Sequence, residues 1–416
     1  MSMRKVGKTN VVFDVLLVFA LLLAIFLVRS YGDETYIWFQ MLISLNFGYL
    51  LFKVFVSFFY KPIHGESDEL KVTAIIPCYN ETLDAIEKSI DSLVKQSVQV
   101  DEIIFIDDGS ESRECFDFLS SYQQTDIPIV VHRFEENKGK KEAIVWGIAH
   151  AKNELLLMLD SDGELKINAV EELRKPFSNE NVGTVCGRIM VRNYKASYLA
   201  KIQEIVYFNT FEVGRASQSM FNSVIVASGA LSMHRRAIFD ERALETFRRE
   251  RFFGINCIAG DDRLLTDISK QNGYDCVYQN TAVCYTEVPE KLPKYFKQQV
   301  RWLKSAYLQS LFSIRHCWKK PIVLLYQLFE AYLWAFNWLM AIALVLTIGI
   351  SVTVKMVFVW VIYSFLVSLI TSVKYRQFGL RLYLLSTFYC FIYGFFISVT
   401  RIYALLTLKK TGWSTR

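Results

Sequence analysis

Four short motifs of acidic, basic and aromatic residues follow one another in the middle of this chain. They are Asp107-Asp108-Gly109-Ser110, Asp160-Ser161-Asp162, Gly260-Asp261-Asp262-Arg263 and Gln298-Gln299-Val300-Arg301-Trp302. Clustered carboxylates suit a divalent cation that bridges phosphate oxygens, and a well-placed carboxylate can act as a general base. Taken together, the motifs predict a site for a phosphate-bearing substrate and a group-transfer reaction.

Asp160 and Asp162 come directly after the apolar run 155–159, which has the composition of a strand. Successive residues of a strand point to opposite faces, so a turn must bring the two carboxylates together. Such a pair favours Mg²⁺ or Mn²⁺. The alternative is an acidic turn that caps the next helix.

Asp107 and Asp108 occupy the same place after an earlier predicted strand, 102–106. Their carboxylates could accept hydrogen bonds from a ribose hydroxyl or a base N–H group, or they could simply form a turn with a helix cap. The segment Asn137-Lys138-Gly139-Lys140-Lys141 precedes a predicted helix. Its basic side chains and the helix N-terminus suit a diphosphate, with a solvated basic loop as the alternative.

Asp262 is the candidate general base, with Asp261 beside it. Glycosyl transfer with inversion needs one base for the acceptor hydroxyl, whereas a glycoside hydrolase needs two carboxyl groups flanking the bond and a water. One acid next to a diphosphate site fits transfer better, although an Asp–Arg surface pair is the plainer alternative. Arg301 could clamp a phosphate and Trp302 could stack on a sugar, or both could belong to an interfacial belt.

Alternating apolar patterns surround these motifs. We expect strands at 72–77, 102–106, 129–132 and 154–159, and helices at 83–95 and 140–151. This β-α-β alternation predicts a parallel sheet with helices on both faces. Ligands of such sheets bind beyond the carboxyl ends of the strands, where both early acidic motifs fall.

The chain is strongly hydrophobic for its 416 residues: 52% are apolar and the mean hydropathy is +0.24. The apolar residues concentrate at the two ends, which favours membrane spans over a large core. The expected spans are 11–28, 36–60, 322–350, 356–373 and 380–408, the last being long for one span, so that a re-entrant or partly interfacial segment is an option. Basic residues before the first span put the N-terminus and the middle domain in the cytoplasm.

The chain accordingly divides into four predicted parts. They are two N-terminal transmembrane helices (1–60), a cytoplasmic α/β domain (61–290), amphipathic interface helices with the Gln298–Trp302 motif (291–320), and a C-terminal transmembrane region (321–416). The net charge of +6 fits the basic cytoplasmic segments of membrane proteins, and the absence of a compact Lys/Arg run in the middle domain argues against nucleic acid. None of the eight cysteines forms a C-x-x-C pair, so we expect free thiols rather than a zinc site.

At these residues the chain resembles the membrane-embedded, processive family-2 glycosyltransferases, which include hyaluronan, chitin and cellulose synthases. It is most similar to the streptococcal type of hyaluronan synthase, and the likeness covers nearly the whole chain. Besides the motifs above, the stretches that carry it are 57–62 (Ser-Phe-Phe-Tyr-Lys-Pro), 74–81 (Ala-Ile-Ile-Pro-Cys-Tyr-Asn-Glu), 228–232 (Ser-Gly-Ala-Leu-Ser) and 413–416 (Trp-Ser-Thr-Arg).

The resemblance implies a GT-A fold, a UDP-sugar donor with Mg²⁺ or Mn²⁺, and a multi-pass protein of the plasma membrane. It also implies that a β-linked polymer leaves through a channel formed by the same chain. Tyr79, Glu81 and Asp107 match uridine-binding positions with Asp108 beside them, and Asp160 matches a nucleotide contact. Lys140 matches a diphosphate contact, Asp162 the metal ligand and Asp262 the base. Gln298, Arg301 and Trp302 match the motif that holds diphosphate and acceptor at the channel mouth.

Some positions depart from the hyaluronan synthase pattern. Gly163, Ala227, Ala230 and Ser414 stand where Thr, Cys, Pro and Gly are usual, and His234 stands where Tyr is usual. Ala227, Ala230 and His234 are expected beside the acceptor pocket, so they bear on the identity of the polymer.

The first hypothesis is therefore a synthase that alternates UDP-GlcNAc and UDP-GlcA into hyaluronan, with the growing polysaccharide and membrane lipids as its other partners. Related alternatives are a chitin-like oligomer or another capsular polymer. A transferase that moves one sugar onto a lipid phosphate should lack the Gln298–Trp302 motif. A non-catalytic export protein should have lost carboxylates such as Asp162 and Asp262, which are present here.

Overall fold

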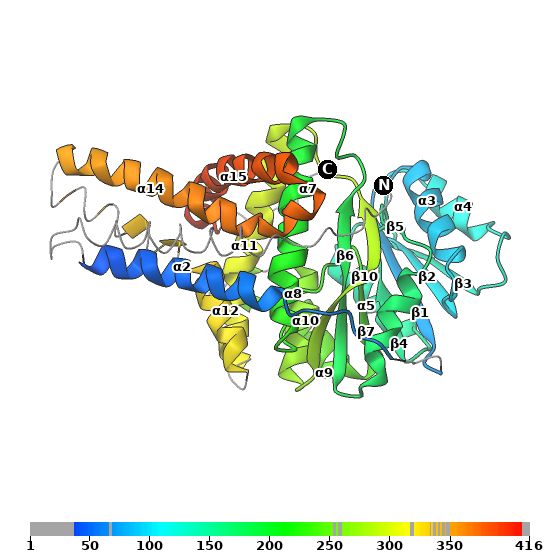
Figure 1. Cartoon of the computed structure of the whole chain (residues 1–416). Coiled ribbons are helices and arrows are strands. Elements are labelled where there is room, and N and C mark those ends of the chain that lie inside the picture. Colours follow the sequence, from blue (N-terminus) through cyan, green and yellow to red (C-terminus); the bar gives the residue numbers. More distant parts are fainter. Residues whose placement is uncertain are drawn as a thin grey trace.

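The computed structural model describes residues 37–409 apart from 66–68, 253–254, 257–259, 317–319 and parts of 333–349. An α/β domain forms one side of the molecule, and long helices extend from it on the other side (Figure 1). The predicted first membrane helix (11–28) and the terminal segment 413–416, including Ser414, lie outside the described residues.

The α/β domain is built on an eight-stranded sheet with the order β3-β2-β1-β4-β7-β6-β10-β5. Its strands are β1 (Val72–Cys78), β2 (Glu102–Asp107), β3 (Ile129–Arg133), β4 (Leu155–Met158), β5 (Glu164–Leu165), β6 (Val182–Val191), β7 (Ser232–Arg235) and β10 (Asp275–Thr286). A separate hairpin pairs β8 (Arg251–Phe252) with β9 (Ile255–Asn256).

The four strands expected from the sequence are confirmed, and β3, β2, β1 and β4 run parallel to one another. The expectation of a wholly parallel sheet is wrong for the other half. There β7 runs antiparallel to both β4 and β6, and β5 runs antiparallel to β10. The β-α-β rule applies where a helix returns the chain to the same end of the sheet. β7 instead follows a long helical excursion, so its direction could not be inferred from that rule.

Helices cover both faces of the sheet, as expected. Along β1, Ala74 and Ile76 pack toward α3 (Leu83–Val94), while Ile75 packs toward α5 (Lys140–His150) on the opposite face. This is the period-2 alternation of a strand that is buried on both sides. The two cores fix the strands rigidly, so loops at their carboxyl ends are held in defined positions.

The order of the strands reverses at β1. The chain moves from β1 outward to β2 and β3, and then returns to place β4 on the other side of β1. A crevice at the carboxyl ends of the two central strands is the expected ligand site of such a sheet. The segments beyond Cys78 and Met158 therefore flank the natural binding position.

The second half of the domain supplies two further positioning elements. One is a long helical segment made of α7 (Tyr198–Asn209), a π-helical turn (Thr210–Arg215) and α8 (Ala216–Ser219). The other is α10 (Asp261–Gln271), which begins at the third acidic motif after Gly260, a residue with a φ of +91°.

The remaining helices are α2 (Ile37–Ser57), α11 (Leu292–His316), α12 (Pro321–Ala331), α14 (Ile350–Thr371) and α15 (Leu380–Leu406), with a 3₁₀ segment at Val373–Phe378. One 25-residue helix, α11, stands where several interface helices were expected. The segment expected at 380–408 is also one helix, because α15 is continuous over 27 residues, or about 40 Å. This speaks against a re-entrant turn within it, and a partly interfacial position stays a prediction. Among the described residues, α15 is the one helix that is both long and apolar enough to cross a membrane.

Ion pairs and hydrogen bonds join the helices to the α/β domain. The Lys374 ammonium donates to the carbonyl oxygen of Ser57, at the end of α2, and to that of Glu212 in the π-helical turn, each at 2.6 Å. Lys53 of α2 forms an ion pair with Glu330 of α12 at 2.9 Å. α2 is thus attached to α12 and to the segment between α14 and α15, and that segment is attached to the α/β domain.

Candidate active site

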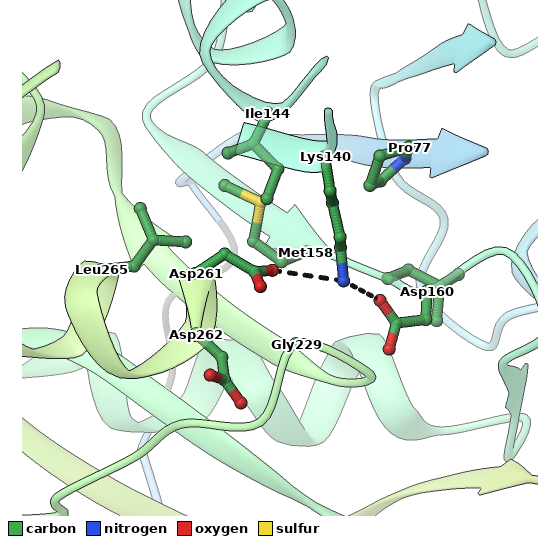
Figure 2. A pocket seen from close by; sticks show the side chains of 10 residues that line it. Pro77, Lys140, Ile144, Met158, Asp160, Gly229, Asp261, Asp262 and Leu265 are labelled. Atoms are coloured by element: carbon green, nitrogen blue, oxygen red, sulfur yellow. Dashed lines mark hydrogen bonds and ion pairs between the residues drawn. The ribbon is translucent and has the colours of Figure 1, made fainter. Parts of the chain in front are cut away.

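A small pocket lies at the carboxyl ends of β1 and β4 (Figure 2). Two of the four motifs, 160–162 and 260–263, contribute to it together with the basic segment 137–141. The Lys140 ammonium lies between two carboxylates, 2.6 Å from Asp160 Oδ1 and 3.2 Å from Asp261 Oδ2. Asp262 lines the same pocket on the side of Gly229. The structure therefore brings together Lys140, Asp160, Asp261 and Asp262, which lie up to 122 positions apart in the sequence.

Lys140 and Asp261 are held in their charged forms. Burial would lower the pKa of Lys140, but the carboxylates of Asp160 and Asp261 outweigh it and raise that pKa above its usual range. Burial would likewise raise the pKa of Asp261, yet the Lys140 ammonium lowers it. A lysine that stays protonated at the strand ends is suited to bind an anionic group.

Asp262 has a different environment, although it is the next residue in the same helical turn. Burial and the neighbouring Asp261 carboxylate raise the pKa of Asp262 to about 6, while the backbone N–H of Arg263 and the charge of Lys140 oppose the shift. The Arg263 N–H donates to Asp262 Oδ1 at 2.7 Å. Two adjacent carboxyls with pKa values moved in opposite directions are the pattern of a charge-holding acid beside a proton-transferring one.

Hydrogen bonds also orient Asp162, in the turn after β4, and Glu81, in the loop after β1. The Thr286 hydroxyl donates to Asp162 Oδ2 at 3.2 Å, and the Ser161 hydroxyl donates to Glu81 Oε2 at 3.3 Å. Within the described residues, no three His, Cys, Asp or Glu side chains gather into a ready-made metal site. Two carboxylates on one turn still fit Mg²⁺ or Mn²⁺, because these ions commonly take one or two protein carboxylates together with substrate phosphates.

Asp107 and Asp108 are buried and are held by their own loop, by the end of β3 and by the segment before α5. Asp107 accepts from the Ser110 N–H at 3.0 Å and pairs with Arg133 at the end of β3. Asp108 accepts from the backbone N–H groups of Lys138 and Gly139, at 2.8 and 2.9 Å. These N–H groups at the start of α5, which the sequence suggested for a diphosphate, therefore have a carboxylate partner in this structure. Direct contact of either aspartate with a nucleoside stays a prediction.

Gln298, Arg301 and Trp302 lie on α11 and are not among the residues that line the pocket. Trp302 is 41% exposed, and the Gln298 Oε1 atom is buried with no hydrogen-bond partner in the part of the chain that the structure describes. An aromatic face and a spare acceptor are groups that a sugar can use. α15 packs on this part of α11, with the rings of Tyr295 and Phe396 stacked at 5.2 Å.

His234 does not lie where the sequence analysis placed it. The side chain is fully buried in β7, its Nδ1 lies 3.0 Å from the Thr184 hydroxyl, and its Nε2 lies 3.0 Å from the Ser232 hydroxyl. With both ring nitrogens bonded inside the sheet, His234 is a packed core residue. Ala227 and Ala230 are also buried, but they flank Gly229, which does line the pocket.

Comparison with known proteins gives this pocket its context. Residues 73–243 match the model of glycosyl transferase family 2. The hyaluronan synthase of Streptococcus pyogenes is 34% identical over 379 residues, which is 88% of either chain. The chain belongs to the hyaluronan-synthase-like glycosyltransferases of family 2.

Two further comparisons give a more distant sequence relative and a solved structure of similar fold. An N-acetylglucosaminyltransferase of Azorhizobium caulinodans is 29% identical over 255 residues, covering 60% of this chain and 64% of that one. A solved mannosyltransferase of Pyrobaculum calidifontis, in complex with GDP-Man and Mn²⁺, superposes with a TM-score of 0.62 at 19% identity, over 88% of this chain and 96% of that one. The latter confirms the GT-A-like α/β fold.

The structure also adds residues to the glycosyltransferase site that the sequence analysis missed. Arg133 holds Asp107, and the Asn137 amide donates to Asp108 Oδ2 at 3.1 Å. Glu250 and Gln309 lie behind the Asp261–Asp262 turn. Asn137 belongs to the basic segment 137–141, but Glu250 and Gln309 have no motif around them and could be found only from their position in the fold.

Proposed function

We propose that this protein is a processive, inverting glycosyltransferase that polymerises UDP-sugars into a β-linked polysaccharide, with hyaluronan from UDP-GlcNAc and UDP-GlcA as the product. The observation that carries the proposal is the pocket at the strand ends. There Asp262, with its pKa raised to about 6, adjoins the charged cluster of Lys140, Asp160 and Asp261.

In the proposed reaction, Asp262 accepts the proton of an acceptor sugar hydroxyl. The oxygen then attacks the anomeric carbon of the donor sugar, the bond from that carbon to the diphosphate breaks, and UDP leaves with the electron pair. Lys140 provides positive charge beside the departing diphosphate, since its ammonium lies in the same pocket as Asp262. A general base whose pKa lies near the working pH is efficient in such a step.

The donor is proposed to lie across the ends of β1, β2 and β4. Tyr79, Glu81 and the Asp107–Asp108 loop would border the uridine, with Asp160 contacting the nucleotide. Asp162 would hold a divalent cation, Mg²⁺ or Mn²⁺, which supplies positive charge next to the phosphates. The placement of Glu81 on Ser161 of this turn supports a common donor site.

The acceptor and product are proposed to follow α11 and the C-terminal helices. Gln298, Arg301 and Trp302 would hold the end of the polymer, and α15 would belong to a channel through the plasma membrane. We assign the α/β domain to the cytoplasm and the chain to the multi-pass membrane proteins. The packing of α15 on α11 next to this motif supports such a path.

A related β-glycan is the second candidate product. The likeness to an N-acetylglucosaminyltransferase favours a chitin-like oligomer, and Ala227 and Ala230 beside Gly229 differ from the usual hyaluronan synthase pattern. A lipid-phosphate monoglycosyltransferase is less well supported, because Trp302 and Gln298 are present on α11.

Purified protein in lipid nanodiscs, supplied with Mg²⁺ and UDP-sugars singly and in pairs, tests this assignment. Polymer that forms only with UDP-GlcNAc and UDP-GlcA together, and that hyaluronidase digests, is the expected result. Polymer from UDP-GlcNAc alone would replace hyaluronan with a chitin-like product. Transfer of a single sugar to lipid would overturn the processive mechanism.

A further inference from the structure

The turn that carries Asp261 and Asp262 is attached to α11 by a buried set of hydrogen bonds. Gln309 of α11 donates from Nε2 to the carbonyl oxygen of Gly260 at 2.8 Å and to Glu250 Oε2 at 3.2 Å. The Ser305 hydroxyl donates to Gln309 Oε1 at 3.0 Å, which fixes the orientation of the amide. Gln309 is fully buried, and Glu250 is 7% exposed.

The same cluster includes Lys141, at the start of α5. Glu250 Oε2 also accepts an ion pair from Lys141 at 3.2 Å, and Lys141 is the neighbour of Lys140 in α5. Burial raises the pKa of Glu250, and the Lys141 ammonium opposes this shift. The Glu250 carboxylate therefore contacts both Lys141 of α5 and Gln309 of α11. Gln309 in turn holds the turn before α10, so α5, which carries Lys140, and α10, which carries Asp262, are linked through the same two residues.

The contact between the turn and α11 is close. A Cβ atom added at Gly260 would lie 1.8 Å from Ser305 Oγ and 2.4 Å from Gln309 Oε1, in addition to the strain of its positive φ. Gly260 also caps the N-terminus of α10, since its carbonyl oxygen accepts from the Leu264 N–H at 3.1 Å. A shift of this carbonyl would move the first turn of α10 and with it the carboxylate of Asp262.

Ser305 and Gln309 lie on the same face of α11 as the motif proposed to hold the acceptor. Ser305 and Gln309 are about one turn apart, and Trp302 and Gln298 precede Ser305 along the same face at helical spacing. One face of a single rigid helix thus carries both the motif proposed to hold the acceptor and the amide that anchors the base-carrying turn.

We propose that Gln309 and Glu250 are positioning residues of this glycosyltransferase, which hold the Asp261–Asp262 turn on α11 and so set the base against the acceptor. The proposal rests on the assignment of Asp262 as base. It predicts that loosening the anchor lowers turnover much more than donor binding. A displacement of about 1 Å at a reacting group can cost roughly a hundredfold in rate.

The test compares Gln309→Leu with the matched control Ser310→Ala. Ser310 is the adjacent buried polar residue of α11, but its hydroxyl bonds to the Tyr307 carbonyl oxygen and lies 2.7 Å from the Tyr332 hydroxyl. We expect Gln309→Leu to lower kcat by about tenfold or more while the Kd for UDP, measured by calorimetry with Mg²⁺, changes by less than about twofold. Ser310→Ala should keep kcat within about twofold, even if its melting temperature falls.

A double-mutant cycle adds a readout that general destabilisation does not give. If Gln309 and Glu250 act as one anchor, the fold-loss in kcat of Gln309→Leu with Glu250→Gln should be smaller than the product of the single losses. Multiplicative losses, or equal losses in Gln309→Leu and Ser310→Ala, would overturn the positioning role. If Gln309→Leu keeps full turnover while Asp262→Asn loses it, only the positioning inference fails. If Asp262→Asn itself keeps full turnover, the proposed mechanism fails.

Discussion

At the scale of single residues, the surroundings of two neighbouring carboxyl groups in the pocket shift their pKa values in opposite directions. Asp261 faces the Lys140 ammonium and keeps a lowered pKa, whereas burial and Asp261 raise that of Asp262. The charged groups that act on Asp262 are Asp261, Lys140 and Arg263. This division assigns charge binding to one side of the turn and proton transfer to the other.

The pH dependence of turnover follows from this arrangement. A base works in its deprotonated form, so kcat should be nearly constant above the pKa of Asp262 and should fall about tenfold per pH unit below about pH 6. Initial rates at saturating donor between about pH 5 and 8 measure it. A kcat that stays constant down to about pH 5, as the ordinary aspartate pKa of about 3.9 would give, would contradict a raised pKa.

Lys140 gives a second prediction at this scale. Lys140→Met removes the ammonium between Asp160 and Asp261, so two carboxylates lose their counter-charge and the diphosphate loses its cation. We expect the KM for the donor to rise by about tenfold or more, because a charged hydrogen bond contributes roughly 1.5–3 kcal/mol. Lys138→Met is the control, since Lys138 is exposed in the same loop. Equal effects of the two substitutions on KM would contradict the assignment.

At the scale of elements, the loops after β1 and β2 pack closely against each other and against the segment 136–137. Asn80 N–H donates to the Ser110 hydroxyl at 2.9 Å, so the two loops fix each other. Gly109 adopts a φ of +69°, and a Cβ there would lie 2.5 Å from the carbonyl carbon of Glu136. The loop that buries Asp107 and Asp108 therefore needs glycine for conformation and for space.

Gly109→Ala should consequently destabilise the protein more than Gly273→Ala does. Both residues have positive φ, which costs a substituted alanine about 1–2 kcal/mol, but the Cβ of residue 273 would meet nothing within 4 Å. The backbone clash at 109 should add about 1–3 kcal/mol. Melting temperatures in detergent, followed by the loss of monodisperse protein, compare the two variants. Equal melting temperatures would show that the loop can move away from 136–137 at no cost.

These elements also show how far the sequence could predict the structure. Apolar runs were enough to predict β1 to β4, and periodic patterns were enough for α3 and α5. The acidic residues after β2 and β4 could be placed at one edge of the sheet, because parallel strand ends share an edge. The direction of β7 depends on a long helical excursion and could not be inferred. The resemblance to the family placed His234 beside the acceptor pocket, but its side chain packs inside the sheet. Gln309 shows no local pattern, since its role comes from contacts with residues about 50 and 60 positions away.

At the scale of the whole molecule, one lysine joins three parts that are distant in the sequence. Lys374 lies between α14 and α15 and donates to the carbonyl oxygens of Ser57 and Glu212. It thereby ties the end of α2 and the π-helical turn of the α/β domain to the C-terminal helices. In Figure 1, α2 and α14 extend side by side from this junction.

Lys374→Met should therefore loosen the attachment between the domain and the helices. Two carbonyl groups lose a charged donor, and we expect a loss of about 2 kcal/mol or more in stability. Arg381→Met, an exposed cation at the start of α15, should change stability by no more than about 0.5 kcal/mol. Melting temperatures and the rate of proteolysis within 58–71 measure the difference. Equal melting temperatures and equal proteolysis rates for the two variants would contradict the role of Lys374 in joining the helices to the domain.

The central claim is that Asp262 is the base of sugar transfer in a pocket whose other charged groups bind the donor. The most direct measurement pairs turnover with UDP affinity in Asp262→Asn, a substitution of nearly equal size. The account predicts that kcat falls by at least about a hundredfold, while the Kd for UDP with Mg²⁺ stays within about threefold of the unmodified protein. Full turnover in this variant would contradict the account.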